Sequence, residues 1–151
     1  MQTFETKQEL SISLKEGWEF FSNPANLKKI TPEKMGFDIL NESLSSKIYP
    51  GMIIKYRVRP LWNIPMKWVT EITQVNAPNY FIDNQKSGPY AYWHHQHFLS
   101  ETDTGIEIHD IVNYKVPFGL IGQWIEKILV KRKVAEIFEY RRLRLKEIFP
   151  S

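Results

Sequence analysis

The stretch Leu120–Ile148, LIGQWIEKILVKRKVAEIFEYRRLRLKEI, decides the fold of this sequence. Its apolar residues recur at the spacing of an amphipathic helix, and the face predicted to be buried carries Ile121, Trp124, Ile128, Ala135 and Phe138. At 1.5 Å per residue such a helix would be about 43 Å long. A chain of 151 residues is too short to surround it on all sides. One face of the helix must therefore pack along a sheet of similar length.

The residues before this helix predict that sheet. Apolar and polar residues alternate in six segments, which are Thr3–Ile12, Met52–Val58, Met66–Val75, Tyr80–Gln85, Tyr92–Leu99 and Ile106–Val116. Two short helices are expected after the first strand, and Ser13 and Glu16 have the spacing of a capping box at the start of the first helix. The predicted fold class is α+β, with a curved antiparallel sheet wrapped around the long C-terminal helix in one domain, residues 1–151.

The composition excludes several classes of protein. With 42% hydrophobic and 25% charged residues, the chain is typical of a globular protein and not of a disordered one. It contains no cysteine, which removes disulfides, thiolate metal sites and cysteine nucleophiles. The first ten residues resemble no signal peptide, and no run reaches the roughly 18 apolar residues of a membrane span. We therefore expect a cytoplasmic protein.

The basic residues gather at the C-terminus. The formal net charge is +3, and eight basic and four acidic residues lie between Leu120 and Ser151. Because glutamates are interspersed among the basic residues, this pattern indicates the solvated face of a helix. We expect no binding of nucleic acid.

The segment Tyr90–Leu99 carries the most informative side chains. Trp93, His95 and His97 share one face of a strand because side chains alternate along it. The next strand has a single charge on its apolar face, Asp110. A four-residue hairpin loop, Thr102–Gly105, would place Asp110 opposite His97, whereas a three-residue loop would place it opposite Phe98. We favour the four-residue loop, which predicts an inward-facing His–Asp pair.

Several interpretations of this pair remain open. His95 or His97, oriented by Asp110, would hydrogen-bond a ligand in an apolar cavity, or the pair would only satisfy buried polar groups. As an acid–base pair, His97 and Asp110 would serve the cyclisation or dehydration of a poly-carbonyl chain. The set His95, His97 and Asp110 is also permissible for a metal, but no further ligand accompanies it. We therefore expect no metal and no cofactor.

The segment Pro60–Pro65 places Leu61, Trp62 and Ile64 at the tip of a predicted hairpin, where polar residues are usual. The segment is interpreted as a gate of the cavity or as a weak contact with a membrane or a protein. The alternative is a loop that folds back onto the core.

Several segments together resemble the START-like, polyketide-cyclase-like SRPBCC superfamily, to which birch-pollen-allergen-like proteins belong. The matching residues are Ile64-Pro65-Met66-Lys67-Trp68, Glu71-Ile72, Phe81, Asp83, Gln85, Gly88-Pro89-Tyr90, Trp93, His95, His97, Phe98, Gly105, Asp110, Val112, Tyr114, Pro117 and Gly119. The resemblance is to bacterial stand-alone members, and it implies a helix-grip fold with a hydrophobic cavity beneath the C-terminal helix. It does not choose a function, because the superfamily includes lipid carriers, hormone receptors, cyclases and chaperone co-factors.

We therefore expect a protein that binds a small hydrophobic ligand, such as a lipid, an isoprenoid or an aromatic, polyketide-like molecule. The expected ligand-binding residues are Tyr56, Trp68, Asp83, Gln85, Trp93, His95, His97, Asp110, Tyr114, Trp124 and Ile128. Two alternatives stay open, a cyclase- or dehydratase-like enzyme that uses His97 and Asp110, and a partner-regulating or stress-related module with a vestigial cavity. The expected oligomeric state is a monomer or a homodimer.

Overall fold

A single antiparallel sheet of seven strands organises the computed structural model, which describes residues 1–60 and 62–151. The strands lie in the order β1-β7-β6-β5-β4-β3-β2. Their bounds are β1 Gln2–Leu10, β2 Asp38–Ile39, β3 Ile53–Val58, β4 Met66–Asn76, β5 Tyr80–Ser87, β6 Tyr92–Thr102 and β7 Gly105–Lys115. The five long strands expected between residues 52 and 116 are thus confirmed, together with the first strand.

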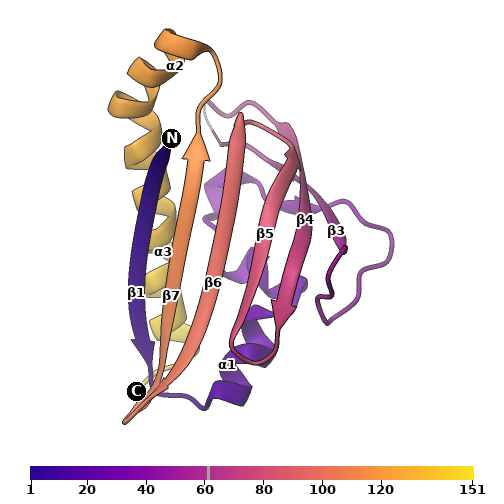
Figure 1. Cartoon of the computed structure of the whole chain (residues 1–151), viewed down its shortest axis with the longest axis vertical. Helices are drawn as coiled ribbons and strands as arrows, with labels where there is room; N and C mark the ends of the chain where they lie inside the picture. The colour runs from indigo at the N-terminus through magenta and orange to yellow at the C-terminus, as the bar shows by residue number, and fades with distance from the viewer. Residues whose placement is uncertain (61) are drawn as a thin grey trace.

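The helices all cover one face of this sheet (Figure 1). They are α1 Leu14–Phe21, the 3₁₀ turns η1 Pro24–Ile30 and η2 Glu33–Met35, and the C-terminal run of α2 Gly119–Ile125, η3 Glu126–Val130 and α3 Lys131–Ile148. α3 runs along the sheet behind β1 and β7, and α1 lies near the opposite end from α2 (Figure 1). This is the α+β architecture predicted from the sequence. Among the described residues, no helix combines the length and hydropathy needed to cross a membrane.

The capping box predicted for α1 is confirmed. The Glu16 backbone N–H donates to Ser13 Oγ over 3.1 Å, and the Ser13 backbone N–H donates to a Glu16 carboxylate oxygen over 2.9 Å. α1 then packs closely on β7 because it presents Gly17, where a β-carbon would collide with the side chain of Ile106. Residues of α1 and its cap thus set both the start of the helix and its distance from the sheet.

β6 and β7 pair in the register that the four-residue loop predicts. Thr102 pairs with Gly105, and this register places His97 opposite Asp110. On β7 the residues that alternate toward α3 are buried, and Tyr114 and Val112 are almost fully enclosed. The prediction that the His–Asp pair lies on the inner face is therefore confirmed.

The long C-terminal helix differs from the prediction at its centre. The Lys131 backbone N–H donates to Glu126 O, five residues back, so the segment η3 is a π turn. Its wider turn shifts the buried stripe to positions four residues apart, which are Gly122, Glu126, Val130, Val134 and Phe138. The predicted face assumes a regular helical period, and it is wrong everywhere except at Phe138. The other four members of that face, Ile121, Trp124, Ile128 and Ala135, are exposed.

Candidate functional site

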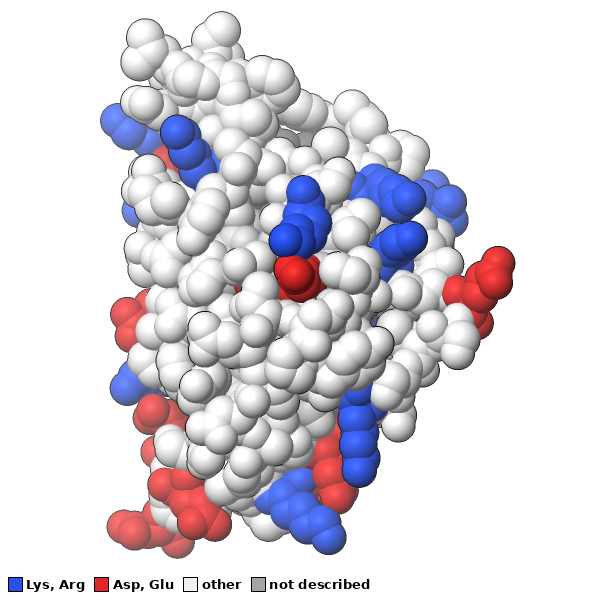
Figure 2. Space-filling view, turned by 45° about the vertical axis from the view of Figure 1, so that its right-hand side comes forward, with Lys and Arg blue, Asp and Glu red and all other residues white. Residues whose placement is uncertain are grey.

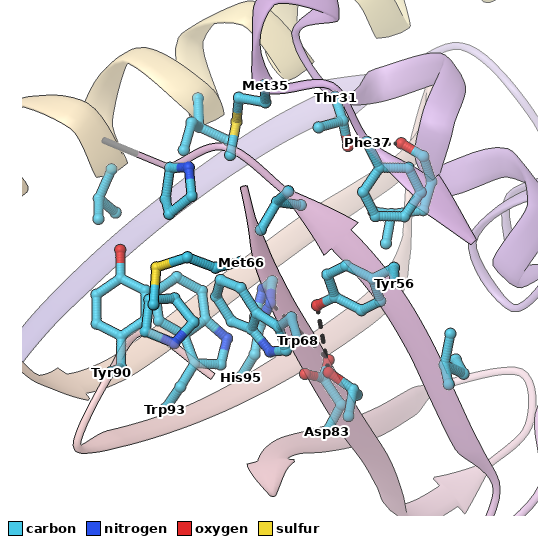
Figure 3. A pocket seen from close by; sticks show the side chains of 18 of the residues that line it. Thr31, Met35, Phe37, Tyr56, Met66, Trp68, Asp83, Tyr90, Trp93 and His95 are labelled. Atoms are coloured by element: carbon cyan, nitrogen blue, oxygen red, sulfur yellow. Dashed lines mark hydrogen bonds and ion pairs between the residues drawn. The ribbon is translucent and has the colours of Figure 1, made fainter. Parts of the chain in front are cut away.

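A cavity of about 630 Å³ lies between the inner face of the sheet and α3. Its walls are mostly apolar, and aromatic side chains from β3, β4 and β6 form much of its surface. Figure 3 shows Tyr56, Trp68, Trp93 and His95 converging on this space, with Asp83 beneath them. The volume lies within the range of about 300–1,000 Å³ that is usual for small-molecule sites.

Two histidines and two aspartates form a hydrogen-bonded cluster at the sheet side of the cavity. Strand pairing sets Asp83 opposite His95 and His97 opposite Asp110, all on the inner face. His95 Nε2 donates to Asp110 Oδ1 over 2.8 Å, and His97 Nε2 donates to Asp83 Oδ2 over 2.6 Å. His97 Nδ1 lies 3.1 Å from Asp110 Oδ1. The ring of His97 also stacks on Phe81, with centroids 4.0 Å apart.

The pKa values of the four side chains in this cluster shift in different directions. Burial opposes the charged form of His97, but hydrogen bonds to Asp110 and Asp83 outweigh burial and raise its pKa. Burial and the neighbouring His97 lower the pKa of His95. Burial would raise the pKa of Asp110 and of Asp83, yet hydrogen bonds from the histidines hold the pKa of both carboxyls below the usual range. The raised pKa favours the imidazolium form of His97, which lies between two carboxylates.

Arg141 is the member of the site that sequence reasoning missed. It extends from α3 into the cavity lining, and its guanidinium carbon lies 4.9 Å from the centroid of the Phe138 ring. Burial lowers its pKa, while Asp110 and Asp83 oppose that shift, and a guanidinium remains charged in proteins. The interspersed charges of this helix predict a solvated face, and for Arg141 that prediction is wrong. The useful signal was the spacing of Phe138 and Arg141, three residues apart on one face.

Six of the eleven predicted site residues line the cavity, and these are Tyr56, Trp68, Asp83, Trp93, His95 and His97. Asp110 and Tyr114 lie behind the lining: Asp110 contacts the two histidines, and the Tyr114 hydroxyl donates to Glu126 over 3.1 Å. Gln85 turns away and makes two hydrogen bonds to the backbone of Tyr90, which hold the β5–β6 turn.

The predicted positions of Trp124 and Ile128 in the cavity are wrong. Their exposed fractions are 67% and 59%, and neither belongs to the lining. The π turn explains the error, because it shifts α2 by one residue relative to the face of α3. On α3 the cavity is instead lined by Val134, Ile137 and Phe138.

Asp83, His95 and His97 form a candidate set of metal ligands, because their ligand atoms all lie within 4.8 Å of one another. Both histidines, however, already donate a ring N–H to a carboxylate. The charged guanidinium of Arg141 lines the same cavity and would repel a cation. The geometry therefore fits a hydrogen-bond network better than a metal centre.

The mouth of the cavity has an apolar rim. Trp62 and Ile64, from the connection between β3 and β4, and Phe118, which precedes α2, all line the opening and are more than half exposed. Backbone φ angles are positive at Trp62 (49°), Asn63 (56°) and Phe118 (75°), a conformation that is costly for residues other than glycine. Leu61, which the sequence places at the same loop tip, lies outside the described residues.

Comparisons with known proteins identify the fold. No protein-family model matches the chain, and a search of curated proteins found no match. Among solved structures, a START superfamily protein from Mycobacterium smegmatis has a TM-score of 0.70 at 12% identity, covering 97% of this chain and 96% of its own. A protein from Arthrobacter aurescens has a TM-score of 0.70 at 14% identity, covering 96% of this chain and 86% of its own. A protein from Thermus thermophilus has a TM-score of 0.68 at 11% identity, covering 97% and 95%. The chain has the START-like helix-grip fold, as the resemblance implied.

Proposed function

We propose that the protein binds a small, mostly apolar ligand, such as a lipid, an isoprenoid or an aromatic, polyketide-like molecule. The observation that carries this proposal is a cavity of about 630 Å³ with aromatic walls and one buried polar end. The apolar walls supply affinity through burial, and a few convergent polar groups fix the orientation of the ligand. The START-like fold is generally a ligand-binding fold, which supports the same conclusion.

A second candidate is a cyclase- or dehydratase-like enzyme. It is favoured by the position of His97, whose two ring nitrogens contact Asp83 and Asp110 at the wall of the cavity. His97 could transfer a proton to a carbonyl oxygen once one of its ring nitrogens turns from its carboxylate toward the ligand. The third hypothesis, a module with a vestigial cavity, is disfavoured by the volume of the cavity.

Native mass spectrometry of the purified protein tests this proposal. We expect a native mass that exceeds the denatured mass, because an apolar cavity of this size retains cellular ligand. The identity of the released molecule then separates the two candidates: a poly-carbonyl precursor or its dehydrated product indicates an enzyme, and an unreactive lipid indicates a carrier. A native mass equal to the denatured mass, with no binding of added lipids or aromatic acids, would contradict ligand binding.

The apolar rim continues onto α2, and we propose that it contacts the surface of an anionic membrane. Large apolar side chains on the first turns of the C-terminal helix are more than half exposed, namely Phe118, Leu120, Ile121, Trp124 and Ile128. Lys115, Lys127 and Lys131 flank them and form no ion pair among the described residues. On the face in Figure 2, the upper end is uncharged, basic side chains lie below it, and most acidic ones lie at the opposite end. Such an apolar tip with lysines beside it complements anionic lipid headgroups.

Vesicle co-sedimentation tests the membrane contact. We expect the protein to bind phosphatidylcholine vesicles that contain phosphatidylglycerol, and to bind vesicles of phosphatidylcholine alone about a hundredfold less. The reason is that each of the three lysines near an anionic surface adds about 1 kcal/mol, and about 1.4 kcal/mol is a factor of ten. The variant Trp124→Ser should lose most of this binding. Leu143→Ser is the matched control, because Leu143 is an exposed apolar residue of α3 that lies outside the rim. Equal binding by both variants would contradict the contact.

A further inference from the structure

Arg141 differs from the other arginines of α3. Arg132, Arg142 and Arg144 each pair with a glutamate three or four residues away on the helix surface. Arg141 forms no ion pair within 4.0 Å among the described residues, although it is the arginine that faces the cavity. Its guanidinium is instead held over the face of Phe138. The side chain is therefore partly buried, with no direct anionic partner among the described residues.

The nearest carboxylates are already engaged. Asp110 accepts a hydrogen bond from His95, and Asp83 accepts one from His97. The two buried carboxylates are thus bonded to histidines and not to Arg141. Arg141 Nε is buried and has no hydrogen-bond partner among the residues that the structure describes. Trp68 lines the same cavity, and its indole Nε1 is also buried without a partner in the described part of the chain. Two N–H donors beside one cavity thus lack an acceptor among the described residues, a state that costs free energy.

We propose that the ligand carries a carboxylate at one end and that Arg141 binds this carboxylate. This inference rests on the proposed ligand-binding function and names the chemistry of the ligand. The planar guanidinium offers two parallel N–H groups that match the two oxygens of a carboxylate. A phosphate monoester is less suitable, because its second negative charge would approach Asp83 and Asp110 with only one arginine to compensate it. The apolar part of the molecule would lie against the aromatic walls.

The charge of the site predicts that a proton accompanies the ligand. The ionisable groups that face this end are Tyr56 on β3, Asp83 on β5, His95 and His97 on β6, Asp110 on β7 and Arg141 on α3. Two carboxylates balance one guanidinium and one imidazolium, while Tyr56 stays neutral. A ligand carboxylate would leave one buried negative charge uncompensated, which is costly. We expect His95 to take up a proton, so the acid should bind more tightly as the pH falls from about 8 to about 6.

Two matched pairs of probes test the carboxylate. Lauric acid is compared with lauryl alcohol, and naphthoic acid with naphthylmethanol, by isothermal titration calorimetry on the full chain. We expect at least one acid to bind wild-type protein about tenfold to a hundredfold more tightly than its alcohol. Arg141→Met, which keeps an apolar stem, should abolish this preference for the acid over the alcohol. Arg142→Met on the exposed face of α3 is the control and should behave as wild type.

The outcomes are distinguishable. If an alcohol binds wild type as tightly as its acid, or if Arg141→Met retains the preference for the acid, the carboxylate inference is wrong and the ligand-binding function stands. If neither member of either pair binds, the proposed function fails together with the inference. The wild-type comparison does not depend on the stability of a variant, and Arg141→Gln provides a second, polar replacement should Arg141→Met fold poorly.

Discussion

Replacing Asp110 with alanine is expected to lower the free energy of unfolding by about 3–5 kcal/mol at neutral pH, because it removes one of the two carboxylates that balance the buried positive charges of the cluster. Asp110 is 6% exposed and contacts both His95 and His97. Without it, the imidazolium of His97 keeps one carboxylate, and the N–H of His95 has no acceptor. Urea denaturation followed by tryptophan fluorescence measures the loss.

The pH profile of the same variant provides a second test. Folding favours the charged form of His97 and the neutral form of His95, because the pKa of His97 is raised and that of His95 is lowered. The unfolded histidines both titrate near a pH of about 6.5, so the unfolded chain binds more protons below this pH and fewer above it. Wild-type stability should therefore peak near a pH of about 6.5. It should fall again below about pH 4, where the unfolded aspartates bind protons that Asp83 and Asp110 do not.

Asp110→Ala should flatten the alkaline side of this profile, since His97 loses one of the two partners that raise its pKa. Asp38→Ala is the matched control, because Asp38 forms two ion pairs, with Lys28 and Arg57, that lie at the surface. Exposed pairs of this kind contribute little to stability. Equal stability of Asp110→Ala and Asp38→Ala would mean that the buried cluster does not form in solution.

Replacing Ile137 with tryptophan is expected to weaken ligand binding by about a hundredfold. Ile137 lines the cavity from α3 and is half-buried, so an indole there occupies space that the ligand requires. Excluding roughly 100 Å² of apolar ligand surface at about 25 cal/mol per Å² costs about 2.5 kcal/mol, which is close to a hundredfold in affinity. Native mass spectrometry should show the loss of retained mass, and calorimetry with lauryl alcohol should show the loss of affinity.

Ala135→Trp is the control for this variant. Ala135 lies on the same helix but is exposed and outside the cavity lining, so the same indole there should leave binding unchanged. We expect both variants to unfold within about 1.5 kcal/mol of wild type, because neither forces a large side chain into a filled core. Undiminished binding by Ile137→Trp would place the ligand elsewhere than between the sheet and α3.

The sequence predicted the sheet and the inward pair of His97 and Asp110, because side chains alternate between the two faces of a strand. Once the loop Thr102–Gly105 was chosen, the position of Asp110 opposite His97 followed from counting residues. The faces of β3 and β6 followed in the same way, which is why Tyr56 and Trp93 were correctly assigned to the cavity.

The helix was harder to predict. A π turn changes the helical period at one point, and no residue type at Glu126 or beside it predicts such a turn. The buried carboxylate of Glu126 is explained only by Tyr114, whose hydroxyl reaches it once β7 and the helix meet. Arg141 was missed for a similar reason, because its charge fits a solvated face as well as a cavity until Asp83 and Asp110 are brought near it.

The π turn also has a consequence for comparisons between sequences. A π turn contains one residue more than the matching turn of a regular α-helix. The residues before and after it therefore keep their faces toward the sheet only if that extra residue is counted. An alignment of this chain with a START-like protein whose last helix is regular should therefore open a gap of one residue within the π turn, Glu126–Val130. Without that gap, the alignment would equate Trp124 with an inward-facing residue of the other protein, about 100° away around the helix axis. Exposed residues of this chain would then be compared with buried residues of the other protein.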